Sequence, residues 1–273
     1  MRIVSDSSSN LYTFEGIDYK YVSLKIRVDG REFVDDENLD INEMMTALEK
    51  SSSGSTTSCP NTGEWLEAFE GEDEIFAITI SSKLSGSYNA ALTAAEEYME
   101  EHKGAKVYVF DSRETGPGMA LMIEKIRELK DKGMSFEEIR DAVIEYKKTT
   151  NLAFLLHSVN NLAKNGRVSM ILAKLIGVLD IKMLGRADDG VIDPFGKFKG
   201  EKRAIKETVV EMLRNGYKGG KVRIDHVMNL EAAEKVRALV KEQFPDCDFV
   251  INTCKGLCSH YAERYGYIIG YEC

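Results

Sequence analysis

The sequence has few of the features on which disulfide-rich or nucleic-acid-binding proteins depend. Its 273 residues contain only four prolines and five cysteines, and acidic side chains outnumber basic ones, which gives a formal net charge of −9. This charge argues against a general nucleic-acid surface. The odd number of cysteines lacks the spacing of a secreted disulfide framework, so we expect reduced thiols.

Long apolar runs are also lacking. No segment reaches the roughly 18 apolar residues of a membrane span, because the most apolar run, residues 171–179, contains Lys174 and is followed by Asp180. The chain begins MRIVSDSS, without the apolar core of a signal peptide. We therefore expect a soluble, cytoplasmic protein without integral membrane contact. Apolar residues make up 43% of the chain, which is enough for one large core or two ordinary ones.

Several catalytic and metal-binding motifs are missing as well. The sequence contains no P-loop, no G-x-G-x-x-G and no G-x-S-x-G, so a phosphorylation reaction would take its ATP from a partner. Cys247, Cys254, Cys258 and His260 lack the close cysteine pair of a zinc site. We expect neither a metal nor a cofactor.

Short apolar runs alternate with helical patterns in the first half of the chain. Residues 2–5, 75–80, 107–110 and 152–156 are typical of strands buried on both faces. Helices are predicted over residues 41–50, 61–70, 87–101, 117–132 and 136–147. This alternation predicts a parallel α/β sheet, interrupted by a hairpin that turns at Asp29-Gly30. The serine-rich residues 51–58 are predicted to form a loop.

The second half has a different order of elements. A helical stretch over residues 159–179 precedes a hairpin that turns at Asp188-Asp189-Gly190. A helix over 201–215, a strand over 221–225, a helix over 230–244 and strands over 249–252 and 267–271 follow. We predict two α/β domains: residues 1–150 with a parallel sheet, and residues 151–273 with a mixed or antiparallel sheet.

Two hydroxyl-rich stretches lie where predicted strands or loops lead into helices. In AITISSKLSGSYNAA, Ser85, Gly86 and Ser87 stand at a helix N-terminus, which suits an anion. The alternative is that Ser85 or Ser87 simply caps the helix. In STTSCPNTGEW, a capping box formed further along leaves Thr57 and Ser58 free for a ligand. The two stretches together predict a site for one anionic head group.

Five stretches in this order resemble the DegV family: IVSDSSSNL, TTSCP, ISSKLSGSYNAA, VFDS with glycines after it, and NNLAKNGRVS. The resemblance covers the whole chain. Members of this family bind long-chain fatty acids, and some serve as the acyl-carrying subunit of bacterial fatty acid kinase. The resemblance implies a two-domain carrier and not an enzyme. Thr57 or Ser58 and Ser85 would hold the carboxylate, the acyl chain of an acid such as palmitate would lie between the domains, and a fatty acid kinase would be a partner.

Three basic residues are implied near the head group or the docked kinase: Arg167 in NGRVS, Arg203 at the end of the basic segment KFKGEKR, and His260. Ordinary solvated positions are the alternative for both arginines. The sequence departs from the family pattern at three places. Cys59 stands where Gln is usual, Asn10 replaces a common Asp, and Tyr-Ala-Glu follows His260 in place of the family's x-Gly-Pro-Gly.

Burial of the acyl chain would supply most of the affinity. A chain of 16 carbons contributes on the order of 10 kcal/mol before ordering costs, at about 0.8 kcal/mol per methylene. The apolar residues 170–184 and the aromatic side chains are candidate wall material, with ordinary core packing as the alternative. An acyl-ester or thioester hydrolase with Ser85 or Cys59 as nucleophile is the second functional class.

Overall fold

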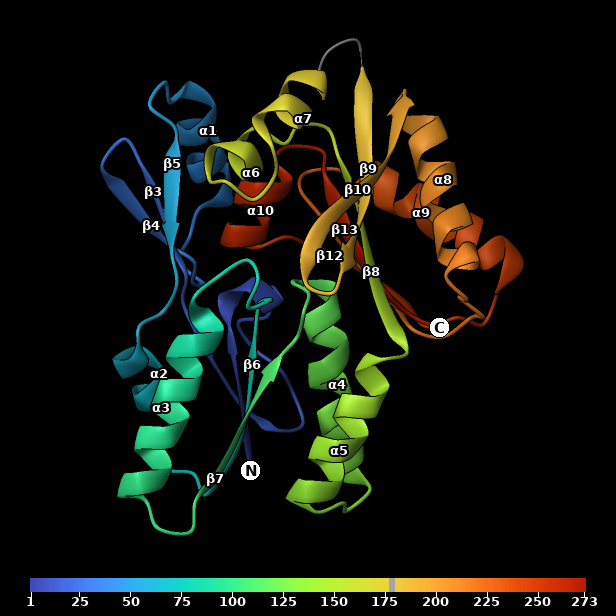
Figure 1. The fold of residues 1–273 in the computed structure, drawn as a ribbon. Helices are drawn as coiled ribbons and strands as arrows, with labels where there is room; N and C mark the ends of the chain where they lie inside the picture. Colours follow the sequence, from blue (N-terminus) through green and yellow to red (C-terminus); the bar gives the residue numbers. More distant parts are fainter. Residues whose placement is uncertain (177–179) are drawn as a thin grey trace.

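The chain folds into two sheets stacked end to end, with a small third sheet beside them (Figure 1). The structure is a computed structural model that describes residues 1–176 and 180–273. Among those residues, no helix combines the length and the apolar character needed to cross a membrane.

The N-terminal sheet consists of four parallel strands in the order β2–β1–β6–β7. β1 (Arg2–Asp6) lies between β2 (Asp18–Val22) and β6 (Glu74–Thr79), and β7 (Lys106–Asp111) forms one edge. The prediction of a parallel sheet is confirmed, but one of the four predicted strands does not belong to it. Residues 152–156 belong to another sheet, and β2 takes the fourth place. Its DYKYV sequence lacks an apolar run because an edge strand is only partly buried.

Two pairs of helices cover this sheet, one pair on each face (Figure 1). α2 (Thr62–Phe69) and α3 (Ser87–Glu101) lie on one face, and α4 (Pro117–Asp131) and α5 (Phe136–Lys147) on the other. All four were predicted from their periodicity to within a few residues.

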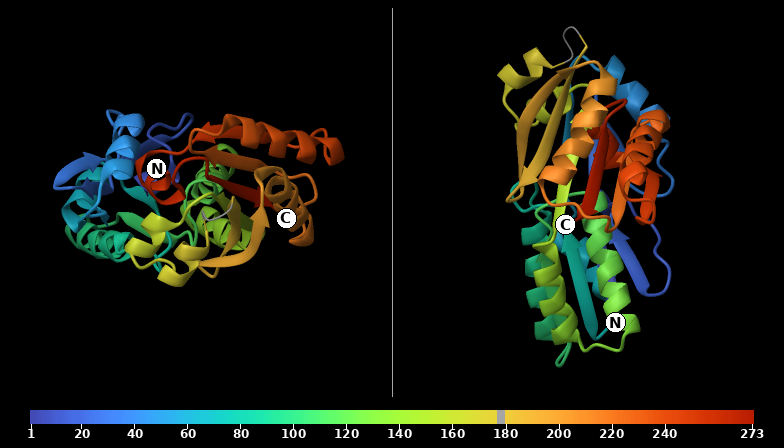
Figure 2. Two further views of the ribbon diagram at one scale, coloured as in Figure 1. Left: turned by 90° about the horizontal axis from the view of Figure 1, so that it is seen from above. Right: turned by 90° about the vertical axis from the view of Figure 1, so that its right-hand side faces the viewer.

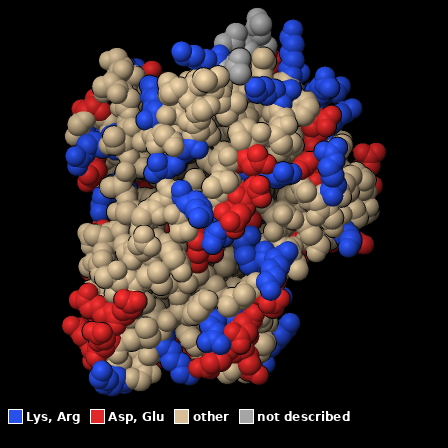
Figure 3. All heavy atoms as spheres, viewed as in Figure 1, with Lys and Arg blue, Asp and Glu red and all other residues tan. Residues whose placement is uncertain are grey.

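In the view of Figure 3, acidic side chains gather at this end of the molecule, whereas basic ones are more frequent at the other.

The second sheet is mixed, as predicted, and has six strands in the order β10–β9–β8–β13–β11–β12. Its strands are β8 (Thr150–Leu156), β9 (Ile181–Asp188), β10 (Val191–Lys199), β11 (Val222–His226), β12 (Phe249–Thr253) and β13 (Tyr267–Glu272). Only β11 and β12 pair in parallel. The β9–β10 hairpin turns at the predicted place, with positive φ at Asp189 and Gly190. α8 (Glu201–Arg214) and α9 (Leu230–Gln243) cover one face.

The helix predicted over residues 159–179 is wrong as a single element. It consists of α6 (Asn160–Lys164) and α7 (Met170–Leu175), and residues 177–179 lie outside the described part of the chain. Gly166, at a φ of 72°, follows the end of α6, and the Ser169 side chain caps α7.

A three-stranded antiparallel sheet completes the fold, in the order β4–β3–β5. β3 (Lys25–Val28) and β4 (Arg31–Val34) form the predicted hairpin, with positive φ at Asp29 and Gly30. The loop predicted over residues 51–58 is wrong in its second half. Ser55–Ser58 forms strand β5, because these small and β-branched residues pair with the free edge of β3.

The small sheet packs against C-terminal elements and away from the parallel sheet. Ile26, Phe33 and Met44 share one apolar cluster with Leu162 and Ile268. α1 (Ile41–Lys50) contacts α10 (Gly256–Ala262), and Figure 2 shows the blue N-terminal segment beside the red C-terminal one. The domain boundary near residue 150 stays a prediction, and β8, which begins there, is the first strand of the six-stranded sheet.

Candidate functional site

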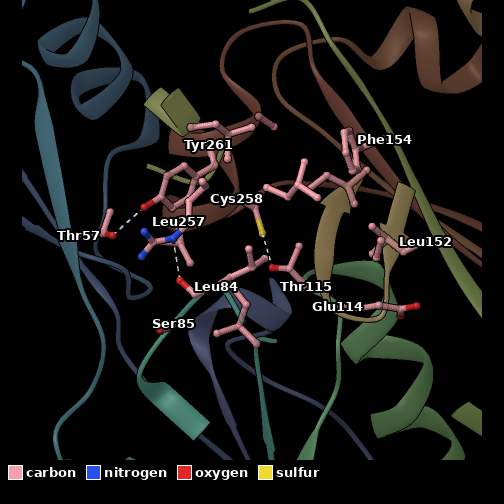
Figure 4. Close-up of a pocket in the computed structure, with 18 of the residues that line it drawn as sticks. Thr57, Leu84, Ser85, Glu114, Thr115, Leu152, Phe154, Leu257, Cys258 and Tyr261 are labelled. Carbon is pink, nitrogen blue, oxygen red and sulfur yellow. Dashed lines mark hydrogen bonds between the residues drawn. The ribbon is translucent and has the colours of Figure 1, made fainter. Parts of the chain in front are cut away.

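A cavity of about 300 Å³ lies between the loops at the carboxyl end of the parallel sheet and one face of the six-stranded sheet (Figure 4). The carboxyl end of a parallel sheet is the usual place for ligands in such folds. Hydroxyl-bearing residues line one side of the cavity, and aliphatic and aromatic residues line the other. In Figure 4, Thr57 and Ser85 lie opposite Leu152 and Phe154.

The polar end contains both hydroxyl-rich stretches that the sequence singled out. Thr57, Ser58 and Cys59 come from β5 and the residue after it, and Ser85 and Gly86 from the start of α3. The two stretches approach each other closely, because a Cβ atom at Gly86 would lie 3.3 Å from the Cys59 sulfur. The structure thus brings the predicted residues other than Ser87 to one cavity, while their contact with a ligand stays a prediction.

The hydroxyls at this end have different hydrogen-bond partners. Thr57 Oγ1 lies 2.8 Å from the hydroxyl oxygen of Tyr261 on α10. Ser85 Oγ accepts a bond from the Ser87 amide at 3.2 Å, and among the described residues no acceptor takes the Ser85 hydroxyl proton. Ser85 can therefore donate to a ligand.

Ser87 has a different role from its neighbour. Its hydroxyl is fully buried and donates to Asp6 Oδ2 at 2.7 Å, so it does not line the cavity. The same oxygen accepts the Ile80 amide, and the other oxygen accepts the Ser8 amide. Burial raises the pKa of Asp6, while these hydrogen bonds oppose the rise. Asp6 thereby holds the end of β6 and the start of α3 in place.

The three basic residues lie in three different environments. Arg167 is exposed at the cavity, where its Nε donates to the Leu84 carbonyl at 2.8 Å. Arg203 is exposed on α8, outside the cavity lining, with its guanidinium 5.7 Å from the ring centre of Phe198. His260 is fully buried, which lowers its pKa to about 3 and prevents direct contact with a docked partner. Its Nε2 lies 2.7 Å from Ser55 Oγ.

The apolar end is built mainly from β8 and the β9–β10 hairpin. Leu152, Phe154 and Leu156 alternate along β8 and face the cavity, and Val191 and Ile192 belong to β10. Residues 170–184, the candidate wall, contribute no lining residue in their described part. Met170 and Ile171 are instead 53% and 75% exposed, because α7 is short and turns these side chains outward.

None of the four histidines, all in the described part of the chain, makes a hydrogen bond to Ser85 or Cys59. His260 bonds to Ser55, His157 lies 3.2 Å from Glu201, His226 accepts the Asn229 amide and His102 contacts the Tyr98 carbonyl. A serine or cysteine hydrolase needs a base within hydrogen-bond reach of its nucleophile. The geometry around Ser85 and Cys59 therefore favours binding over hydrolysis.

The chain resembles known proteins over nearly its whole length. The model of the DegV family, described as an uncharacterised protein family, matches residues 1–264. The chain belongs to the DegV family. A DegV domain-containing protein of Streptococcus pneumoniae is 38% identical over 92% of this chain and 90% of its own length.

Two solved DegV structures resemble the chain over nearly its whole length. A DegV family protein from Eubacterium eligens, loaded with heptadecanoic acid, has a TM-score of 0.98 and 41% identity, and the match covers 100% of this chain and 99% of that one. The Fatty Acid Kinase (Fak) B3 protein of Streptococcus pneumoniae, loaded with linoleic acid, has a TM-score of 0.97 and 36% identity, with 99% and 98% covered.

Sequence reasoning missed two features of this DegV site. Tyr261 was noted only as a departure from the family pattern, although its hydroxyl meets Thr57. The alternate residues of β8 were recognised as a strand but not as the cavity wall. The signal for β8 was its continuous apolar run, which predicts a strand buried on both faces, but a run of this kind does not indicate that one face is open.

Proposed function

We propose that this DegV protein binds a long-chain fatty acid in the cavity between its two large sheets. The carboxylate lies at Thr57, Ser58, Ser85 and the first backbone amides of α3, and the acyl chain runs along β8. One observation carries the proposal: a single cavity has free hydroxyl donors at one end and an apolar wall at the other. The fatty acids held by the Eubacterium eligens and Streptococcus pneumoniae proteins support it.

In this proposal a helix terminus and hydroxyl groups hold the anion. A helix of 15 residues starts at Ser87, and its N-terminus carries a partial positive charge that favours a carboxylate. Gly86, which has no side chain, lets the ligand approach this terminus. Each hydrogen bond to a charged group contributes about 1.5–3 kcal/mol. The apolar wall adds about 0.8 kcal/mol for each buried methylene.

In the same proposal the protein is a non-catalytic, cytoplasmic carrier that presents its acid to a separate ATP-dependent fatty acid kinase. Residues 1–150 supply the carboxylate loops, and residues 151–273 cover the acyl chain. Arg167 stands beside the polar end of the cavity, and Arg203 is exposed on α8. In this proposal Arg167 acts near the acyl phosphate and Arg203 contacts the docked kinase.

Native mass spectrometry tests the binding function. The protein is expressed in bacteria and purified, and its mass is measured before and after extraction of lipid. We expect a bound species heavier by the mass of one long-chain fatty acid, which extraction removes and added hexadecanoic acid restores. A protein that carries no acid after purification and takes up none when hexadecanoic acid is added would contradict the proposal.

A further inference from the structure

In the apolar wall, the ring of a phenylalanine fills the space in which a glycine has no side chain. Phe154 on β8 is directly opposite Gly185 on β9 in the antiparallel pair. A Cβ atom at Gly185 would lie 2.4 Å from both Cε2 and Cζ of the Phe154 ring. The ring therefore lies over Gly185, in the place that any larger residue would fill.

Both residues belong to the face of the sheet that forms the cavity. Phe154 and Ala187 line the cavity, and Gly185 shares the face of Ala187 because side chains alternate along a strand. In Figure 4, Phe154 lies on the side of the pocket opposite Thr57 and Ser85. The ring is thus part of the wall that would meet the far portion of an acyl chain.

We infer that the pair Gly185–Phe154 determines how long an acyl chain the cavity accepts. This inference rests on the proposed function and names the property of the ligand that the pair selects. Because Gly185 lacks a side chain, the edge of the ring lies against β9 and the cavity stays open. An alanine at position 185 would push the ring edge away from the sheet and into the cavity.

The size of this displacement follows from the contact distances. Ordinary van der Waals contact begins at 3.4 Å. The ring edge lies 2.4 Å from the position of the added Cβ, so it must move by about 1 Å or more. The ring edge is the free end of a side chain and can swing, whereas the nearest backbone atom, the Asp193 carbonyl oxygen, is 3.0 Å from the added Cβ. Gly185 has an ordinary negative φ, so alanine does not strain its backbone.

A second glycine provides a matched control. A Cβ atom at Gly196 would lie 2.4 Å from Cε2 of Phe198, the same distance as at Gly185. Phe198, however, packs with the apolar cluster on the opposite face of the sheet, beneath α8, and does not line the cavity. Gly196→Ala therefore displaces a phenylalanine ring without changing the acyl site.

The test measures dissociation constants for dodecanoic, tetradecanoic, hexadecanoic and octadecanoic acids. Each methylene excluded from burial lowers affinity by about fourfold. We expect Gly185→Ala to bind octadecanoic acid at least tenfold more weakly than the wild type, while dodecanoic acid stays within threefold. In Gly196→Ala, the four dissociation constants should keep the wild-type order and the wild-type ratios to one another. An unchanged series in Gly185→Ala would overturn the inference.

Phe154→Leu keeps the test decisive if Gly185→Ala does not fold. A shorter side chain enlarges the cavity, so affinity for octadecanoic acid should rise relative to dodecanoic acid, and Gly185→Ala should have no further effect on chain length in this background. A wild-type series in Phe154→Leu would overturn the inference. Failure of the wild-type protein to bind any of the four acids would instead overturn the proposed function and, with it, this inference.

Discussion

The hydroxyl oxygens of Thr57 and Tyr261 lie 2.8 Å apart and join strand β5 to helix α10 at the polar end of the cavity. Two residues earlier in the strand, Ser55 makes a similar contact with His260 at 2.7 Å. Residues i and i+2 of a strand share one face, so β5 is attached to α10 by two successive hydroxyl contacts. This attachment fixes the position of the Thr57 hydroxyl at the polar end of the cavity.

Removal of the Tyr261 hydroxyl should weaken fatty-acid binding without loss of the fold. In Tyr261→Phe the ring remains and only one hydrogen bond is lost, which corresponds to about a two- to tenfold weaker affinity for hexadecanoic acid. Isothermal titration of the delipidated protein measures the change. Tyr265→Phe, at a tyrosine that is 51% exposed, is the matched control and should bind like the wild type. Equal affinities of the two variants would contradict a role for Tyr261.

Ser85 and Ser87 should give opposite phenotypes although they are two residues apart. Ser85→Ala removes a free donor, so affinity should fall by about ten- to a hundredfold, with only a small fall in melting temperature from the lost contact with the Ser87 amide. Ser87→Ala leaves buried Asp6 without one donor, which should lower the free energy of unfolding by about 1.5–3 kcal/mol. Thermal melts and binding titrations separate the two effects. A destabilised Ser85→Ala protein with unchanged affinity would show that Ser85 only caps α3.

The thiol of Cys59 reports on occupancy of the cavity. Cys59 lines the polar end and is partly exposed, so iodoacetamide should alkylate it in the delipidated protein at least fivefold faster than in the loaded one. Cys247 and Cys273, which lie outside the cavity lining, are internal controls. Cys273 is exposed and should react at one rate in both states, while Cys247, Cys254 and Cys258 are buried. Equal protection of Cys273 by fatty acid would indicate a global change of structure instead of a filled site.

The two arginines should affect phosphorylation more than binding. Arg167→Ala and Arg203→Ala leave the hydroxyl donors in place, so both variants should retain fatty acid yet lose acyl phosphate formation with a fatty acid kinase. The loss in Arg203→Ala should increase with salt, because screening weakens the remaining charge contacts. Lys202→Ala, at the exposed neighbouring position, is the control. Loss of fatty acid in both arginine variants, with kinase binding intact, would show that the arginines act in binding and not in phosphorylation.

Asp225 should make stability depend on pH. It is buried, accepts a hydrogen bond from Asn10 at 2.5 Å, and burial raises its pKa to about 7, against the opposing effects of its hydrogen bonds and the charge of Lys255. Between the unfolded value of 3.8 and about 7, the folded state therefore binds more protons than the unfolded state. Its contribution to stability is complete at low pH and is lost as the pH rises through this window.

Asp225→Asn isolates this effect, since an asparagine oxygen can still accept the bond from Asn10. Relative to this variant, the wild type should become less stable as the pH rises from about 4 to about 7, and the difference should stay constant above that. Urea unfolding at several pH values measures it. A difference that does not change with pH would show that Asp225 is ionised throughout.

Local turn chemistry was sufficient to predict both hairpins. Asp29-Gly30 and Asp189-Gly190 adopt positive φ values that few residues tolerate, so their positions are visible in the sequence. β2 and β5 were missed because edge strands with polar side chains carry no apolar pattern. Their existence depends on the strands beside them, β1 and β3.

The hydroxyl-rich stretches were found because they stand before helices, but the function of each hydroxyl depends on distant partners. Ser87 meets Asp6 across 81 positions, and Thr57 meets Tyr261 across 204. Similarly, the Phe154 ring can lie against β9 only because Gly185 is directly opposite. Contacts between residues so far apart in the sequence arise from the complete fold. The sequence therefore predicts the residue types of the site but not the role of each residue.

The packing of residues 25–58 against late elements also has a consequence for biosynthesis. Their apolar side chains Ile26, Phe33 and Met44 are covered by Leu162 and Ile268, which leave the ribosome long after them. Until these later residues have been synthesised and have packed, this apolar face stays exposed to water and to chaperones. β13, near the end of the chain, occupies the middle of the six-stranded sheet, between β8 and β11. Translation must therefore be nearly finished before the cavity in a nascent chain is complete.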